Sequence, residues 1–496
     1  MKNIIVFTVI AALFASCSSF LDKEAQGVLT NKEFFQTEND AFSSVVAAAS
    51  SFKDYRYTRS IWAFGDITSD DATMSGSDND VASARRWENL EFHADFARTK
   101  DRWNTCFQAV NMASQAIDGI SAMDVSKFKM YNKERLLGEA YFIKSYFYFE
   151  LVRSYGDLPL ITKTPTIDDK TKKRSPKAEV YQIIEADLTA AAKNLVRKKE
   201  LSVSEYGKPT SEAAWALLAK VYLYQEKYAE SKKVIEDYML PLVPGEYDLM
   251  PDFESIFSMK NEHCKESVFE INFRHKSDDW GLTTTGNYSA YAQGPRPFMG
   301  YGGNQPIQTL ADAFEKNDTR CEATLLTTAE LKKWETSDNF NSLVFNRTGY
   351  YNQKAYIKPY ERIGTEDIFS FPNNLRVMRL SEIYLIYAEA CNKQGADDLA
   401  RIYVNKVRNR AGLAPISVSA EQLFKAIQQE NRVEFAMEGH RYFNLIRTKT
   451  AKAALSNPAY KAIKPNANFK EGINELFPIP QSEIDNSQGN ILQNPM

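Results

Sequence analysis

The chain has 496 residues, which is enough for one large domain or two ordinary domains with a substantial buried core. Its 61 lysines and arginines nearly balance 64 aspartates and glutamates, which gives a formal net charge of −3 at pH 7. This balance argues against the concentrated basic excess of a nucleic-acid-binding protein, and we expect no nucleic-acid partner.

The N-terminus has the layout of a secretory signal that ends at a cysteine. Lys2 precedes the uncharged, mostly apolar stretch from Ile4 to Phe14, and two small residues then precede Cys17. This order is typical of a cleavable signal, and the stretch is too short for a bilayer span of about 20 residues. We predict that residues 1–16 are removed and that Cys17 is lipidated. A cytosolic chain with an apolar N-terminal strand is the alternative.

Apolar residues recur at spacings of three and four in several segments, which predicts amphipathic helices. One runs from Glu134 to Ser154, and the turn-forming residues Gly156, Asp157 and Pro159 end it. Further helices are expected at 180–195, 211–225, 228–238, 380–393, 399–410 and 420–438.

Two of these helices match the first helix of a tetratricopeptide repeat, which has the pattern Trp-x2-Leu-Gly-x2-Tyr. The matching residues are Trp215, Leu218, Ala219 and Tyr222 in one helix, and Leu137, Gly138 and Tyr141 in the other. Small residues at the glycine position let two helix backbones approach closely. We therefore predict a mainly α fold, a tetratricopeptide-like helical-repeat scaffold, with Trp215 in its core.

Two stretches between the helical blocks lack any regular periodicity. Residues 67–79 are polar, and residues 278–304 are rich in glycine, proline and aromatic residues. A long irregular loop in a compact domain is usually functional, and exposed tyrosine and tryptophan rings can pack on the flat apolar face of a sugar. We predict ligand contacts here, with Arg296 donating to hydroxyl or carboxylate groups. The candidate ligand-binding residues are Trp87, Trp280, Tyr288, Tyr291, Arg296 and Tyr301.

Metal sites have little support in the sequence. The cysteines after Cys17 form no CxxC pair, and the histidines have no ligand spacing, so we expect free, buried thiols and no structural metal. Asp70, Asp71, Asp78 and Asp80 could hold calcium through oxygen ligands. Because the EF-hand spacing is absent, we favour a solvated loop for these aspartates.

Catalysis also lacks a convincing motif. Glu434, Glu438 and Arg441 are spaced by four and three residues on one predicted helical face. Glycoside hydrolysis needs two carboxylates on opposite sides of a substrate, so we interpret these residues as an ion-pair network that supports the helix. Asp318 and Arg320 are interpreted as a structural turn pair.

Six blocks, in order along the chain, carry a family resemblance. They are CSSFLD at 17–22, AYFIKSY at 140–146 with Gly156, Pro159 and Leu160, LSEIYLIYAEA at 380–390, VNKVR at 404–408, EFAMEGHRYFNL at 434–445, and the ending from PIP at 478–480, with Glu483 and Ile484, to QNP at 493–495. Together they resemble the SusD/RagB-like outer-membrane lipoproteins of Bacteroidetes, with Asn444 in place of the aspartate usual in that family.

The resemblance implies tetratricopeptide-like helix pairs that support an irregular, loop-rich ligand-binding face. It also implies a non-enzymatic lipoprotein of the outer membrane that faces the cell exterior, binds oligosaccharide and passes it to a SusC-like TonB-dependent transporter. We expect an N-terminal part at 17–260 and a C-terminal part at 261–496, packed as one globular unit. Peptide uptake of the RagB type and a protein-interaction scaffold are alternatives. No cofactor is expected, apart from a possible bound calcium.

Overall fold

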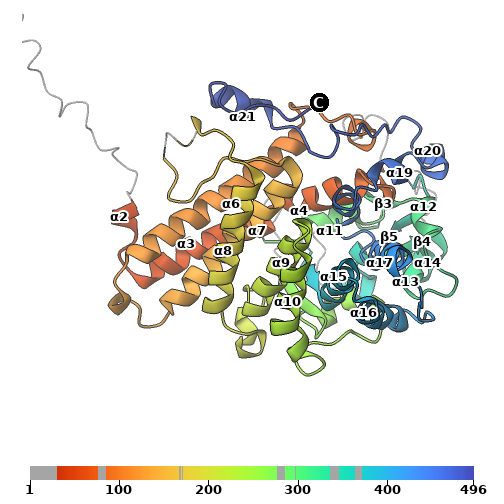
Figure 1. Cartoon of the computed structure of the whole chain (residues 1–496), viewed down its shortest axis with the longest axis horizontal. Coiled ribbons are helices and arrows are strands. Elements are labelled where there is room, and N and C mark those ends of the chain that lie inside the picture. Colours follow the sequence, from red (N-terminus) through yellow and green to blue (C-terminus); the bar gives the residue numbers. More distant parts are fainter. Residues whose placement is uncertain are drawn as a thin grey trace, which may run out of the picture.

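The computed structural model describes residues 31–75, 85–166, 169, 171–275, 285–296, 298–335, 346–362 and 371–496. Cys17, Trp280, Asp78 and Asp80 therefore lie outside the described residues. The described part is mainly helical, with three small antiparallel sheets of two strands each, and the predicted fold class is confirmed (Figure 1).

Two long helices form the centre of the N-terminal half. They are α6 (Ala97–Ala122) and α7 (Lys133–Tyr155), which pack along each other. Helices α3 (Glu38–Ser50) and α8 (Lys177–Asn194) pack against α7 (Figure 1). The helix predicted at 134–154 is thus confirmed. It ends at Gly156, whose φ of +76° favours glycine.

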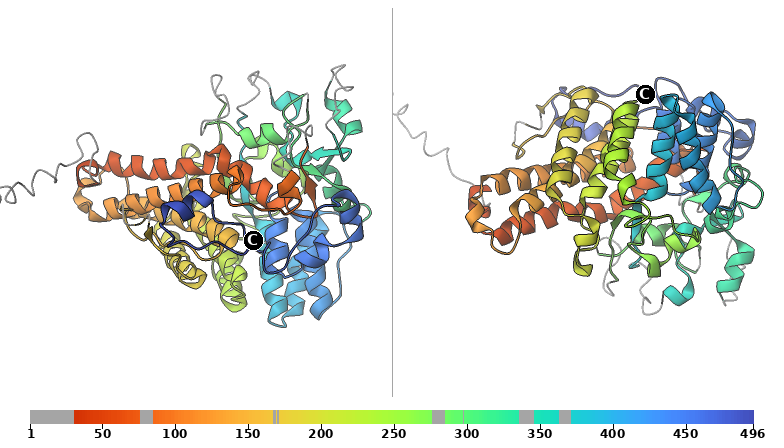
Figure 2. Two further views of the ribbon diagram at one scale, coloured as in Figure 1. Left: turned by 90° about the horizontal axis from the view of Figure 1, so that it is seen from above. Right: turned by 60° about the horizontal axis from the view of Figure 1, so that its bottom comes forward.

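A continuous row of helices follows α8 and extends into the C-terminal half. The members are α9 (Ser211–Tyr224), α10 (Tyr228–Tyr238), α15 (Leu380–Lys393), α16 (Asp397–Arg410) and α17 (Ala420–Glu434). Each contacts a neighbour in the row, as Figure 2 (right) shows. Residues more than 200 positions apart in the sequence, from Ser211 to Glu434, therefore share one scaffold.

Trp215 of α9 lies in the core, as predicted. Its ring stacks on Tyr238 of α10, with 3.8 Å between the ring centroids and an angle of 3° between the planes. The contact joins two successive helices of the row, so this tryptophan stabilises the scaffold.

Helix α17 ends at Glu434, four residues before the predicted end at 438. The chain then turns sharply, with positive φ at Met437 and Gly439. At this turn the backbone packs against Gly65, because a Cβ atom on Gly65 would lie only 2.0 Å from the carbonyl oxygen of Gly439. This close tertiary contact overrides the helical periodicity of the sequence.

The described residues between 285 and 362 form one side of the molecule, green to teal in Figure 2 (left). It contains the short helices α11 (Tyr288–Gln293) and α14 (Thr328–Trp334), and strand β4 (Leu325–Thr327) pairs with β5 (Tyr350–Asn352). The predicted irregular loop at 278–304 thus includes a helix. The remaining sheets pair β1 (Ala72–Thr73) with β3 (Gln305–Pro306), and β2 (Ser267–Ile271) with β6 (Leu375–Arg379).

The main hydrophobic core is contiguous from α3 to the C-terminal segment. A second cluster, which includes Tyr291, Met299, Tyr351 and Tyr356, lies under the green-to-teal side. The four described cysteines are free thiols, and Cys106 and Cys391 among them are buried. The division of the chain near residue 260 stays a prediction.

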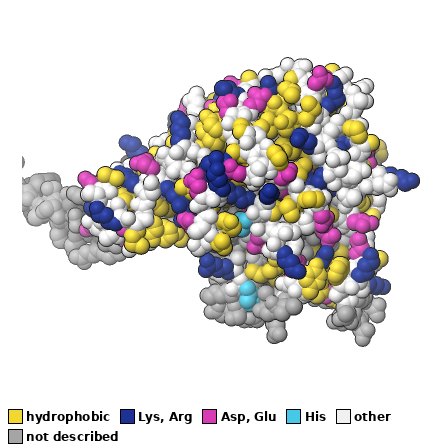
Figure 3. Space-filling view, turned by 90° about the horizontal axis from the view of Figure 1, so that it is seen from below, with side chains coloured by type: hydrophobic (Ala, Val, Ile, Leu, Met, Phe, Trp, Pro, Cys, Tyr) yellow, Lys and Arg dark blue, Asp and Glu magenta, His cyan; other side chains and the backbone are white. Residues whose placement is uncertain are grey.

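The surface carries both signs of charge. On the described part of the face in Figure 3, basic and acidic side chains are interspersed. Among the described helices, none combines the length and the hydropathy needed to cross a membrane.

Candidate functional site

The predicted ligand loop brings three tyrosine rings together. The ring centroids of Tyr288 and Tyr291, both on α11, are 5.6 Å apart. Tyr301 lies edge-on to Tyr291 at 4.9 Å and is 6.4 Å from Tyr288. Tyr55 of α4 (Tyr55–Trp62) adds a fourth ring, 5.4 Å from Tyr288. We call Tyr55, Tyr288, Tyr291 and Tyr301 the tyrosine cluster.

The rings of the tyrosine cluster differ in their exposure to solvent. Tyr301 is 43% exposed, whereas Tyr291 is buried and Tyr288 is half-buried. Burial raises the pKa of Tyr291 to about 12 and raises that of Tyr288 as well. Both phenols therefore stay protonated near neutral pH, so each can donate and accept a hydrogen bond. Such groups suit a ligand that carries hydroxyls.

Arg296 belongs to the same site. Its positive charge acts on Tyr291 and lowers the pKa of that phenol, although burial has the larger effect and raises it. The guanidinium side chain is half-buried and has interactions within the protein. The structure thus places Arg296 with Tyr288, Tyr291 and Tyr301, four of the predicted site residues.

Glycines bring Tyr301 back onto α11. The amide of Gly302 donates to the carbonyl of Gly294 (2.7 Å), and the amide of Gly303 donates to that of Ala292 (2.9 Å). A Cβ atom on Gly300 would lie 1.6 Å from the carbonyl oxygen of Tyr291, so any other residue would force the two backbone segments apart. The glycines of this segment therefore allow its backbone to pass close to α11.

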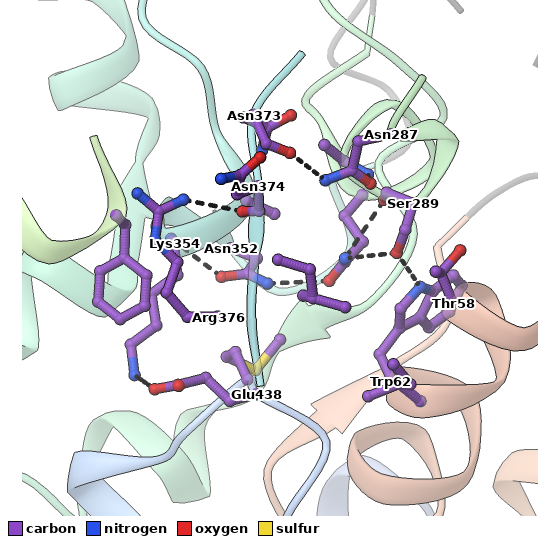
Figure 4. Close-up of a pocket in the computed structure, with 17 residues that line it drawn as sticks. Thr58, Trp62, Asn287, Ser289, Asn352, Lys354, Asn373, Asn374, Arg376 and Glu438 are labelled. Atoms are coloured by element: carbon purple, nitrogen blue, oxygen red, sulfur yellow. Dashed lines mark hydrogen bonds and ion pairs between the residues drawn. The ribbon is translucent and has the colours of Figure 1, made fainter. Parts of the chain in front are cut away.

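Polar side chains fix the opposite side of α11. Asn287 caps the helix by accepting from the amide of Ala290 (3.0 Å), and its Nδ2 donates to the carbonyl of Asn373 (2.8 Å). Trp62 Nε1 donates to Ser289 Oγ (3.0 Å). These residues line a small internal cavity of about 70 Å³, drawn in Figure 4.

Gln293 at the end of α11 completes this attachment. Its Oε1 accepts from Asn352 Nδ2 (2.9 Å) and from Asn304 Nδ2 (2.8 Å). Asn304 Nδ2 also donates to the buried carboxylate of Asp66 (3.0 Å). Because one side of α11 is held by directed hydrogen bonds, its tyrosines are pre-organised on the other side.

A second pair of exposed rings lies on the same side of the molecule, and our sequence analysis did not identify it. Trp334 and Tyr360 are 37% and 49% exposed, and their ring centroids are 5.9 Å apart. Lys358 Nζ lies 4.6 Å from the Trp334 ring and pairs with Glu254 (2.6 Å). In the sequence, the feature that could have indicated this pair is Trp334, which is followed by the mostly polar stretch 335–342.

Trp87, in contrast, is not placed for a ligand contact. Its side chain is fully buried, its ring stacks on Phe477 at 5.2 Å, and its Nε1 donates to the carbonyl of Ala63 (2.7 Å). The proposed binding role of Trp87 is therefore wrong for this structure. Trp87 has polar neighbours in the sequence, but its ring belongs to an aromatic core that includes Phe477, almost 400 positions away.

The aspartates predicted in a solvated or calcium-binding loop are buried where the structure describes them. Asp70 bonds Arg441 (2.8 and 2.9 Å), and Asp71 pairs with Arg432 (2.7 Å). Burial alone would raise the pKa of Asp70, but Arg441 and Arg432 outweigh it and hold the pKa well below its usual range. Guanidinium groups thus neutralise these carboxylates. Among the described residues, no cluster of three potential metal ligands occurs.

Glu434 and Glu438 belong to a buried ion-pair network, as predicted. Glu434 pairs with Arg379 (2.9 Å), Arg410 (2.5 Å) and Arg320 (3.1 Å). Glu438 shares Arg379 but lies in the turn after α17. Glu434 is fully buried against arginines, and Glu438, at the edge of the cavity in Figure 4, is held by Arg379 and Lys354, so the two do not flank a substrate as a glycosidase pair would.

The structure also shows the partners of Arg441 and of Asp318. Arg441 pairs with Asp70 rather than with the two glutamates, because the chain turns after Glu434. The predicted turn pair of Asp318 and Arg320 is confirmed at 2.8 Å.

Comparisons with known proteins agree with this architecture. One family model, described as the SusD family, matches residues 265–496, and another, described as "Starch-binding associating with outer membrane", matches residues 19–223. SusD-like protein P2 of Formosa agariphila is 26% identical over 100% of this chain and 99% of its own. A SusD-like protein of Bacteroides ovatus is 25% identical over 90% of this chain and 82% of its own.

Solved structures share the fold. A laminarin binding SusD-like protein superposes with a TM-score of 0.79 and 27% identity, over 93% of this chain and 99% of that one. Surface glycan-binding protein A from Bacteroides thetaiotaomicron, in complex with laminarihexaose, gives a TM-score of 0.77 and 23% identity over 92% and 100% of the two chains. With one family model on each half and relatives along its full length, the chain belongs to the SusD/RagB-like family.

Proposed function

We propose that this protein is a cell-surface lipoprotein that binds an oligosaccharide at the tyrosine cluster and is not an enzyme. Cys17 would carry the lipid that tethers it to the outer membrane. The bound glycan would pass to a SusC-like TonB-dependent transporter. The observation that carries the proposal is the exposed ring of Tyr301, which lies edge-on to Tyr291. Tyr291 belongs to α11, whose opposite side is held by hydrogen bonds.

The chemistry of the cluster supports a sugar ligand. A pyranose has an apolar ring face and polar hydroxyl edges, so it needs an aromatic surface beside groups that donate and accept hydrogen bonds. Tyr301 offers the surface, the neutral phenols of Tyr288 and Tyr291 offer both functions, and Arg296 offers donors. The relative solved with laminarihexaose supports the same ligand class.

The test compares glycans with peptides on the purified chain from residue 18 onward. Native gels that contain laminarin, starch, cellulose derivatives or mannans report binding as retarded migration, and fluorescent peptides are titrated separately. We expect retardation by at least one glycan. Tyr301→Ala should remove most of it, whereas Tyr301→Phe should keep it because the ring stays.

Met130→Ala is the control, since Met130 is 80% exposed and lies in the connection between α6 and α7. It should migrate like the wild type. Binding of peptides with no glycan would contradict the proposal and favour the peptide-uptake alternative. Unchanged retardation of Tyr301→Ala would remove the tyrosine cluster from the site.

A further inference from the structure

A separate groove lies between α6 and the C-terminal segment that carries α21 (Gln481–Asn486). Helix α21 is at the top of Figure 1. Its volume is about 440 Å³. The residues that line it come from α6, from the connection after α7 and from the C-terminal segment, and none belongs to the tyrosine cluster. The groove is therefore a second place where a ligand of several rings would fit.

One face of α6 presents a row of side-chain amides to this groove. Asn104, Gln108 and Asn111 follow one another at spacings of four and three residues, so they share a helical face. Asn104 and Gln108 are exposed. Oδ1 of Asn111 is buried, and no described residue donates a hydrogen bond to it. Buried amide oxygens almost always have a partner, and because this atom is closed to solvent, a donor in the groove would reach it after a turn of the Asn111 side chain.

Apolar side chains lie beside the amides. Phe107 and Met112 are half-buried on α6 and line the groove, and Trp103 and Ile161 are buried beneath them. A ligand with an apolar face and polar edges would contact both kinds of surface. This is the combination already found at the tyrosine cluster.

The walls of the groove are fixed by hydrogen bonds. The amide of Ile161 donates to Tyr148 Oη (2.6 Å), which ties the wall after α7 to that helix. In the C-terminal wall, the amide of Ile491 donates to Ser487 Oγ (3.0 Å). A ligand would thus enter a preformed groove and would lose little affinity to ordering of the protein.

The charge of the lining selects a neutral ligand. Among the described residues that line the groove, the ionisable ones are the acids Asp169 and Glu483, and none is a lysine, arginine or histidine. Asp169 is already bonded to Lys172 (2.5 Å) and to the Thr166 hydroxyl (3.0 Å). An anionic ligand would therefore meet carboxylates, and Lys172 beside them is already paired with Asp169.

We propose that this groove is a second binding site for neutral oligosaccharide, independent of the tyrosine cluster. A sugar hydroxyl would donate to Asn111 Oδ1, the amides of Asn104 and Gln108 would bond further hydroxyls, and Phe107 would contact a ring face. The proposal rests on the proposed function for its class of ligand and adds a site to it. Two sites on one chain would hold a long glycan more firmly than either site alone.

The test is a calorimetric titration of the soluble chain with laminarihexaose, cellohexaose, maltohexaose and mannohexaose, and with penta-alanine as a neutral peptide. The groove variant is N104A/Q108A/N111A, and Asn111→Leu is a single change that keeps the volume. Gln182→Ala, an exposed amide on α8, is the matched control. Thermal denaturation of each variant checks that it is folded.

We expect two hexasaccharide molecules per wild-type chain and one per chain of the groove variant. The affinity of the groove should fall roughly tenfold or more, because three hydrogen-bonding groups are lost. Asn111→Leu should weaken the same site, and Gln182→Ala should leave both sites unchanged. Tyr301→Ala should leave the groove as the remaining site.

Other results separate the two proposals. One hexasaccharide per wild-type chain, lost in Tyr301→Ala and kept in the groove variant, would overturn the second site and leave the proposed function intact. Binding that depends on the groove alone would support the groove and overturn the role of the tyrosine cluster. Penta-alanine binding in the groove without a hexasaccharide would overturn the glycan assignment there, and no hexasaccharide binding at all would overturn both.

Discussion

Replacement of Gly300 by alanine perturbs the tyrosine cluster without touching any ligand-binding side chain. An added Cβ atom would lie 1.6 Å from the carbonyl oxygen of Tyr291 and 2.7 Å from its carbonyl carbon. Ordinary contact requires about 3.5 Å, so the two backbone segments would have to separate by roughly 2 Å. Tyr301 follows Gly300 directly, and its ring would leave the edge contact with Tyr291.

The size of the effect follows from packing and buried area. Forced overpacking typically costs about 1–3 kcal/mol of stability, which a urea denaturation curve resolves. If a sugar covers about 60 Å² of the Tyr301 ring, the lost burial is worth roughly 1.5 kcal/mol. That loss corresponds to about a tenfold weaker Kd. We therefore expect Gly300→Ala to remain folded, with a lower denaturation midpoint and at least about tenfold weaker glycan binding in a calorimetric titration.

Gly245 provides the control for this substitution. A Cβ atom there has a single neighbour within 4 Å, the carbonyl oxygen of Leu242 at 3.8 Å, so Gly245→Ala should change neither stability nor binding. The reasoning would be refuted if Gly300→Ala bound glycan with wild-type affinity and kept the wild-type midpoint. Such a result would mean that the return of the chain onto α11 does not position the ligand-binding ring.

Three further predictions concern the network, the buried acid and the anchor. Glu434→Gln should lower the free energy of unfolding by about 3–5 kcal/mol, because it removes the buried negative charge that Arg379, Arg410 and Arg320 share. The exposed Glu421→Gln on the same helix should change it little. Both are measured by urea denaturation. Burial raises the pKa of Asp66 to about 7, so the folded state retains a proton that the unfolded state loses above about pH 4. Between about pH 4 and pH 7 this group therefore makes stability fall as pH rises, and Asp66→Asn should flatten that part of the curve relative to the wild type; an unchanged slope would refute the assignment. Cys17→Ala should move the protein out of the membrane fraction on cell fractionation, while Cys321→Ala should leave it there; retention of Cys17→Ala would argue against the lipid anchor.

Local periodicity was sufficient for most of the helical scaffold. The apolar spacing of 134–154 and the tetratricopeptide pattern around Trp215 located helices whose bounds agree with the structure within about two residues. These patterns predict helices because each long helix buries one stripe of apolar residues against its neighbours, and the spacing of that stripe is visible in the sequence. Turn residues such as Gly156 mark the ends for the same local reason.

Long-range contacts explain where the sequence was misleading. Trp87 and Asp70 are surrounded by polar residues in the sequence, yet each has its decisive partner far along the chain, Phe477 for the ring and Arg441 for the carboxylate. The end of α17 depends in the same way on the approach of Gly65. The residues next to Trp87 or Asp70 in the sequence do not show which distant residue each will contact.

The candidate site was predictable in part. A glycine-rich stretch with Tyr288, Tyr291 and Tyr301 pointed to close packing and ring contacts, and the structure brings these rings together. Tyr55 was not predictable, because it joins the cluster from a helix more than 200 residues earlier. The pair of Trp334 and Tyr360 likewise forms only when the chain folds.

The most direct test of the central claim is a crystal structure of the soluble chain with the hexasaccharide that binds it most tightly. We predict a pyranose ring packed against Tyr301, within about 4 Å, with hydroxyls bonded to the neighbouring phenols. A structure in which the bound glycan makes no contact with Tyr301, Tyr288 or Tyr291 would contradict it.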